Sequence, residues 1–147
     1  MGLRNFLSSF LPGLEDYGAG ESFFFKKTRE EQSKTVNILV GNSTLVKVNA
    51  TMKTDYQNNE NEGVIDVIYI CKVQEIDGKV IPFQEQDEKA ERLVLDGDLT
   101  PQLQITLLMD VLEKFGLRGS VVPVTDEFVS GHMRVIRLQE RLAGSRQ

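Results

Sequence analysis

The stretch that decides the fold runs from Val67 to Glu88 and has the sequence VIYICKVQEIDGKVIPFQEQDE. It begins as an apolar strand, and Asp77-Gly78 then supplies a residue pair that is typical of a tight hairpin turn. Lys79 to Phe83 forms a short return. Pro82 confines that return to a sheet edge, because proline has no N–H to donate to a ladder. The acidic residues that follow indicate the start of a helix.

The chain before this stretch predicts a second hairpin. The segments TVNILV and TLVKVNATMKTD flank Gly41-Asn42, two residues that tolerate positive φ. The second segment alternates apolar and polar residues, which indicates a strand with one solvated face. Val64 to Val73 has aliphatic side chains on both faces, which predicts a strand that is covered on two sides. Together these segments predict an antiparallel four-stranded sheet built from two hairpins.

Three helices are predicted after the sheet. The first covers residues 84–97, which begin with acids and end at a glycine. The second is capped by Thr100, with Pro101 at its first position. The third follows Thr125 and has the sequence DEFVSGHMRVIRLQERL. We therefore expect a single α+β domain over residues 35–147, preceded by an N-terminal docking arm and linker over residues 1–34.

The arm carries apolar side chains at the i, i+3, i+4 and i+7 spacing of an amphipathic helix, and Pro12 ends that pattern early. A helix of about two to three turns is not stable alone in water, so it must dock on its own domain, on a partner subunit or on a membrane surface. Three consecutive phenylalanines in the linker predict either a short buried strand or an interface anchor. The candidate interface residues of this region are Leu3, Phe6, Leu7, Phe10, Leu11, Phe23, Phe24 and Phe25.

Arg134, Arg137 and Arg141 lie at i, i+3 and i+7 and therefore share one face of the last predicted helix. Such a stripe can contact phosphate, an acidic patch on a protein partner, or only solvent. The chain as a whole has 17 basic and 22 acidic residues and a net charge of −5, which disfavours nucleic acid. We include the three arginines among the candidate protein-interface residues.

The sequence offers little for catalysis or metal binding. His132 is the only histidine and Cys71 the only cysteine, so paired-histidine and multiple-thiolate metal sites cannot form. A Cys71–His132 nucleophile pair is disfavoured because an apolar strand raises the pKa of a thiol, and we expect a buried structural cysteine. Asp96 and Asp98 fit helix ends better than a metal site. We predict no catalytic residue, no metal and no cofactor, and therefore not an enzyme.

Length and composition indicate a soluble globular domain. The 147 residues are 40% hydrophobic and 27% charged, which suffices for one core. The sequence has no run of about 18 apolar residues, the length that a spanning helix needs, and its first residues do not have the pattern of a secretory signal. We expect no membrane span.

The order of a β-rich front, the segment ICKVQEIDGKVIPFQEQDEKAERL and then two or three helices resembles the small tail-assembly chaperones of tailed bacteriophages. The resemblance covers roughly Ile65 to Phe115. It implies binding to the tape-measure protein during tail building, without an active site. The apolar N-terminal helix and the phenylalanine segment depart from that pattern and suit a permanent virion subunit.

We therefore expect a non-catalytic structural or assembly protein of a tailed-phage virion, in the tail or the head–tail region. Its partners would be copies of itself, in a homo-oligomer, and other assembly proteins, and its location the virion or the host cytoplasm. A transient tail-assembly chaperone is the first alternative. A small nucleic-acid-associated regulator that uses the arginine stripe is the second.

Overall fold

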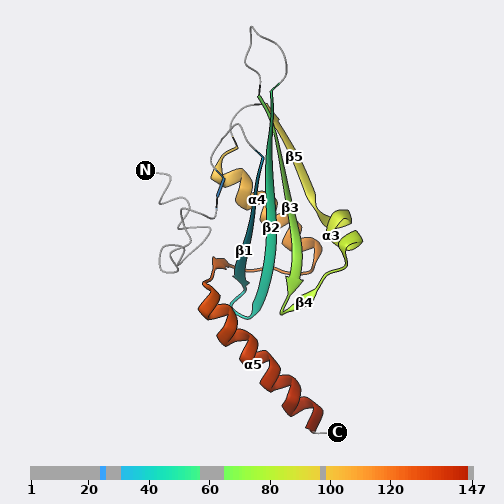
Figure 1. The fold of residues 1–147 in the computed structure, drawn as a ribbon, viewed down its shortest axis with the longest axis vertical. Coiled ribbons are helices and arrows are strands. Elements are labelled where there is room, and N and C mark those ends of the chain that lie inside the picture. Colours follow the sequence, from blue (N-terminus) through green and yellow to red (C-terminus); the bar gives the residue numbers. More distant parts are fainter. Residues whose placement is uncertain (1–23, 26–30, 57–64, 97–98, 146–147) are drawn as a thin grey trace.

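The computed structural model describes residues 24–25, 31–56, 65–96 and 99–145. These residues form an α+β fold with an antiparallel sheet and three helices, as predicted (Figure 1). The elements are β1 (Gln32–Val40), β2 (Thr44–Tyr56), β3 (Ile65–Ile76), β4 (Lys79–Val80), α3 (Phe83–Lys89), β5 (Glu91–Asp96), α4 (Pro101–Lys114), β6 (Val121–Pro123) and α5 (Asp126–Ser145). The N-terminal docking helix predicted from Leu3 to Leu11 lies outside the described residues.

The sheet has six strands, so the prediction of four is wrong. The strand order is β4-β3-β2-β1-β6, and β5 pairs with β3 on the edge that β4 also uses. Both predicted hairpins are confirmed: Gly41 and Asn42 have φ of 62° and 68°, and Asp77 and Gly78 have φ of 50° and 80°. Two consecutive positive φ values are what a two-residue hairpin turn of the primed type requires. The two-residue β4 lies at the sheet edge, as the following proline predicts.

The helix predicted for residues 84–97 is wrong in its second half, where β5 replaces it. In β5, Leu93 and Leu95 pack against the core and alternate with the exposed Arg92 and Val94. This period of two suits a strand that pairs with β3, and the long-range pairing outweighs the local preference for helix. The short segment Val121–Pro123 before α5 forms the further strand β6, which pairs with β1.

One face of the sheet, the packed face, carries the core. Figure 1 shows α4 lying behind this face, and the Thr100 side chain caps the helix by accepting the N–H of Leu103 at 3.3 Å, as predicted. Burial of this many aliphatic side chains supplies most of the drive to fold. The packed face and the inner side of α4 contribute Ile38, Val46, Val48, Met52, Val67, Tyr69, Cys71, Val73, Ile105, Leu108, Val111 and Leu112.

Gln104 of α4 is buried and ties the segment Phe24–Phe25 to the core. Its Oε1 accepts the N–H of Phe25 at 2.9 Å, and its Nε2 donates to the carbonyl oxygen of Phe25 at 3.1 Å. The Phe25 ring meets Tyr69 edge-on, with ring centroids 6.0 Å apart. Lys34 Nζ donates to the carbonyl oxygen of Phe24 at 2.9 Å. The segment therefore covers part of the packed face beside α4.

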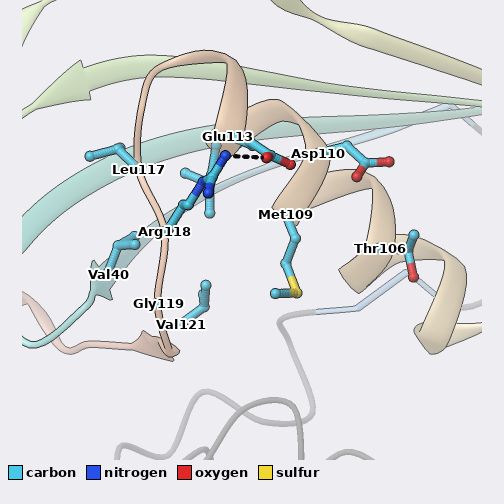
Figure 2. Close-up of a pocket in the computed structure, with 10 residues that line it drawn as sticks. Val40, Thr106, Met109, Asp110, Glu113, Leu117, Arg118, Gly119 and Val121 are labelled. Atoms are coloured by element: carbon cyan, nitrogen blue, oxygen red, sulfur yellow. Dashed lines mark hydrogen bonds and ion pairs between the residues drawn. The ribbon is translucent and has the colours of Figure 1, made fainter.

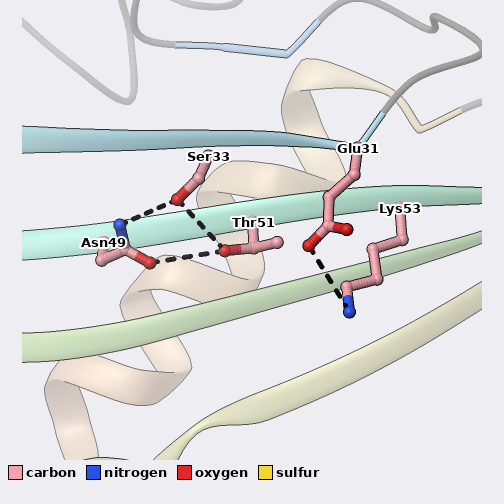
Figure 3. A network of polar contacts seen from close by, with 5 residues as sticks. All are labelled: Glu31, Ser33, Asn49, Thr51 and Lys53. Carbon is pink, nitrogen blue, oxygen red and sulfur yellow. Dashed lines mark hydrogen bonds and ion pairs between the residues drawn. The ribbon is translucent and has the colours of Figure 1, made fainter.

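The opposite face of the sheet, the outer face, is mostly polar. Figure 3 shows Asn49 Nδ2 donating to Ser33 Oγ at 3.0 Å, and the Thr51 hydroxyl donating to Asn49 Oδ1 at 3.4 Å. Lys53 forms a solvent-exposed ion pair with Glu31 at 3.5 Å. Hydroxyl and amide groups that bond to one another along neighbouring strands are what a water-facing sheet surface favours.

The prediction that β3 is covered on both faces is wrong. Ile68 and Ile70 point to the outer face and are only half-buried, whereas Val67 and Val73 on the packed face are fully buried. An antiparallel sheet is stable with one face on the core and one in water, so a single layer suffices here.

A valine at Gly78 tests the hairpin turn. It would have to adopt a φ near +80°, and its Cβ would run into the side chain of Met133. We expect Gly78→Val to lower the free energy of unfolding by at least about 1–2 kcal/mol in urea denaturation, since that is the backbone strain alone. The control is Gly131→Ala, at a helical glycine with open space around it, which should stabilise by up to about 1 kcal/mol.

Replacing Gln104 tests its two hydrogen bonds. Gln104→Ala leaves a buried N–H and a buried carbonyl of Phe25 without partners, which costs about 1–3 kcal/mol for each group. The matched control is Gln102→Ala on the exposed side of the same helix, which should change the free energy of unfolding by less than about 0.5 kcal/mol. Equal effects of the two changes in urea denaturation would show that the pairing does not stabilise the fold.

Candidate protein-binding surface

The candidate site is α5, which leaves the body of the molecule. Thr125 caps its start, since the hydroxyl oxygen accepts the N–H of Phe128 at 3.2 Å. Asp126 and Glu127 lie in the first turn, where carboxylates interact favourably with the helix dipole. Figure 1 shows α5 starting beside the end of the sheet that carries the β1–β2 and β3–β4 turns, and extending past it.

The first turns of α5 contact the outer face of the sheet at the β3–β4 turn, and we call these contacts the root of α5. The Met133 side chain lies against Gly78, where no side chain stands in its way. Val129 and Met133 border a hollow of about 210 Å³, whose other walls include Leu45 and Lys47 of β2. Leu45 is only 5% exposed although it points to the outer face, so the root covers this end of the face.

His132 adds a polar contact to the root. Its ring stacks on Phe128, with centroids 5.9 Å apart and planes 14° from parallel. Its Nε2 lies 3.6 Å from Asp77 Oδ1 and is buried, without a hydrogen-bond partner among the described residues. The distance is that of an ion pair whenever the imidazole is protonated.

Beyond the root, α5 presents apolar side chains to solvent. Val135, Leu138 and Leu142 are 52%, 56% and 53% exposed, and their i, i+3, i+7 spacing places them along one line of the helix. We call these three residues the apolar stripe. These three residues were not among the interface residues predicted from the sequence, although their spacing can be read there. Exposed aliphatic side chains in a continuous line are typical of a protein-binding surface.

The three candidate arginines lie beside this stripe. Arg134, Arg137 and Arg141 are exposed on α5, as their spacing predicts. Within the described part of the chain, none of the three forms an ion pair. They are therefore available to a partner.

The other candidate interface residues fall elsewhere. Phe24 and Phe25 are 7% and 3% exposed in the core of their own chain, so they form a short buried segment and not an exposed anchor. They also show that chain before residue 35 shares the core of the domain. Phe23, together with Leu3, Phe6, Leu7, Phe10 and Leu11, lies outside the described residues.

A second concave feature lies beside α4 (Figure 2). This hollow of about 440 Å³ is bordered by Val40 and Val121 of the sheet and by Met109 of α4, which is 40% exposed. Arg118 pairs with Glu113 at its rim, with 2.8 Å between the charged atoms, and both side chains are largely exposed. Its lining also includes the carboxylate of Asp110 and the hydroxyl of Thr106, which donates to the carbonyl oxygen of Gln102 at 2.9 Å.

The groups considered for chemistry are kept apart. Cys71 lies on the packed face of β3, whereas His132 lies at the root on the outer face. Burial raises the pKa of the Cys71 thiol to about 12. Burial, and secondly the nearby Cys71, raises the pKa of the Tyr69 hydroxyl. Both groups are neutral parts of the core at physiological pH, which agrees with the expected structural cysteine.

Among the described residues, no three side chains of histidine, cysteine, aspartate or glutamate gather into a group that could hold a metal ion. None of the helices described between residues 83 and 145 has the length and apolarity needed to cross a membrane.

Searches against family models, curated proteins and solved structures returned no match to this chain. The resemblance to tail-assembly chaperones therefore remains a prediction from the residues that carry it.

The buried thiol predicts how stability depends on alkaline pH. In the unfolded chain Cys71 ionises near pH 8.5, whereas the folded protein keeps it protonated to about pH 12, so its contribution to stability is present below pH 8.5 and is lost as pH rises from there toward 12. We therefore expect the free energy of unfolding, measured by urea denaturation, to fall between pH 8 and pH 10 by about 1–2 kcal/mol more in the native sequence than in Cys71→Val. Equal losses would mean that the thiol ionises within the folded protein.

Proposed function

We propose that this chain is a non-catalytic structural or assembly protein that makes protein–protein contacts in a multi-subunit complex. The observation that carries the proposal is α5, whose root is held by the sheet while its apolar stripe stands more than half exposed. A solvated helix gains nothing from three exposed aliphatic side chains in line, whereas a bound partner would bury them.

The more specific proposal is a component of a tailed-phage virion, in the tail or the head–tail region. It is supported by the resemblance of residues 65–115 and by the β3–β4 turn that leads through Pro82-Phe83 into α3. A permanent subunit would remain in the finished particle, and a transient tail-assembly chaperone would be absent from it. Immunodetection of the chain in purified particles therefore separates these two forms of the proposal.

A second candidate function is a small nucleic-acid-associated regulator, and the exposed arginines favour it. Binding through them would be steeply salt-dependent, because each contact with phosphate releases counterions. A gel shift with duplex DNA that is lost when Arg134, Arg137 and Arg141 are all changed to glutamine would support this function. Absence of a shift at low salt would exclude it.

Two double variants of similar chemistry test the main proposal. Leu138→Ser with Leu142→Ser removes most of the apolar stripe. Val80→Ser with Val94→Ser removes exposed apolar side chains from the sheet, which are 74% and 57% exposed, and serves as the control. Each variant is co-expressed with the products of the neighbouring genes, and the mass of the purified complexes is measured by light scattering.

We expect the stripe variant to be lost from the complex and the control to be retained. The free energy of unfolding of both variants should differ from that of the native sequence by no more than about 0.5 kcal/mol per substitution, since all four positions are exposed. Complexes of unchanged mass with both variants would contradict α5 as the contact surface.

A further inference from the structure

The apolar stripe of α5 has the spacing of a helix-pairing seam. Val135, Leu138 and Leu142 follow steps of three and four residues, which correspond to positions a, d and a of a heptad. Each step keeps the side chains on nearly the same line of the helix, because a residue advances by about 100°. The occupant that fits such a line is another helix, with its own apolar side chains at the same spacing.

Charge lies on one edge of this seam. Arg134 and Arg141 immediately precede Val135 and Leu142, which places both at heptad position g. The opposite edge carries the uncharged Gln139. The only acidic residue of this half of α5 is Glu140, at position f, which points away from the seam. Residues 134–147 contain four arginines and one glutamate, a net charge of +3, so the rest of the chain carries −8.

A second copy of this chain does not satisfy the charged edge. In a parallel pair, position g of one helix faces position e of the other, so Arg134 would face the uncharged Gln139. In an antiparallel pair, arginines at g would face arginines. Neither arrangement offers a carboxylate, and like charges across a seam destabilise it.

A lipid surface fits less well than a helix. Helices that lie on membranes carry basic residues on a broad polar face around the apolar one. Here the arginines follow one edge, with Gln139 and Ala143 on the other. Duplex DNA would use the arginines but leave the apolar stripe in water.

We infer that the stripe of α5 binds an amphipathic helix of a different protein, whose seam is flanked by glutamate or aspartate side chains that pair with Arg134 and Arg141. This inference rests on the proposed function and names its partner class. Arginine and carboxylate form charge-assisted, often bidentate hydrogen bonds, which would set the register and direction of the partner helix. The acidic remainder of the chain repels an acidic helix, so the partner would lie along the distal part of α5.

The contact would be small. From Val135 to Leu142 the helix rises by only about 10 Å, at 1.5 Å per residue, so one α5 buries far less than the roughly 1,200–2,000 Å² of a stable interface. Each contact is therefore weak by itself, and several copies acting together would give the assembly its strength.

The test uses the full chain and two synthetic helical peptides of equal length, both with leucine at every seam position. One peptide has glutamate at the positions that flank the seam, and the other has lysine there. Fluorescence anisotropy of each labelled peptide should show the glutamate peptide binding about tenfold or more tightly, because two charge-assisted pairs replace two repulsions. Added sodium chloride should reduce that preference.

Charge reversal supplies the internal check. Arg134→Glu with Arg141→Glu should invert the preference, so that the lysine peptide binds better. The matched control, Lys79→Glu with Arg92→Glu, makes the same change in net charge at exposed positions of the sheet and should keep the original preference. Leu138→Ser should weaken both peptides.

Several results would overturn the inference. In the peptide experiment, these are equal affinity for the two peptides or binding of neither. In light scattering, it is a homodimer that Leu138→Ser abolishes. With phosphatidylglycerol vesicles, it is binding that the same change abolishes. The co-expression experiment separates this failure from failure of the proposed function. If the stripe variant still leaves the complex there, the contact surface stands and only its partner class is wrong.

Discussion

A pair of hydrogen bonds between Asp77 and Leu45 holds together the parts of the structure that matter for function. The N–H of Asp77 donates to the carbonyl oxygen of Leu45 at 2.7 Å, and the N–H of Leu45 donates to Asp77 Oδ1 at 2.9 Å. These bonds fasten the β3–β4 turn to the start of β2. The same β3–β4 turn contacts Met133 and His132 of α5. The direction in which α5 leaves the sheet therefore depends on this turn.

The two faces of the sheet show how the chain separates stability from contact. The packed face is covered by α4 and by the segment that Gln104 holds, and together they enclose the core that the described residues form. The outer face is mostly polar, and the root of α5 lies on it at the end that carries the β3–β4 turn. The apolar side chains of distal α5 are thus not needed by the core. On this part of α5, Val135, Leu138 and Leu142 remain exposed, and binding is the role that their spacing and the neighbouring arginines suit.

The sequence predicts local features of this fold well and non-local ones poorly. Both hairpin turns depend on residues that accept positive φ, and Thr100 on a side chain that caps its own helix, so each is determined within a few residues. Strand β5 was missed because its pairing edge on β3 lies elsewhere in the chain. Gln104 was missed because its partner, Phe25, is 79 residues away. The exposure of the three arginines of α5 could be predicted, because their i, i+3 and i+7 spacing places them on one face of the helix. The spacing of Leu138 and Leu142 does not show whether the sheet covers them, since that depends on the root.

The pairing of β6 with β1 has a consequence for the order of folding. Strands β1 to β4 follow one another through short connections, except for residues 57–64, and pair with their neighbours in sequence. Val121 of β6, in contrast, pairs with Val40. Pairing β6 with β1 closes the loop formed by the chain between these two residues, and closing so long a loop costs chain entropy. Pairing offsets this cost only after β1 has formed its part of the sheet, so we expect β6 to pair late in folding. Because α5 follows β6 directly, it acquires its fixed direction only then, and a partly folded chain does not present an aligned seam to its partner.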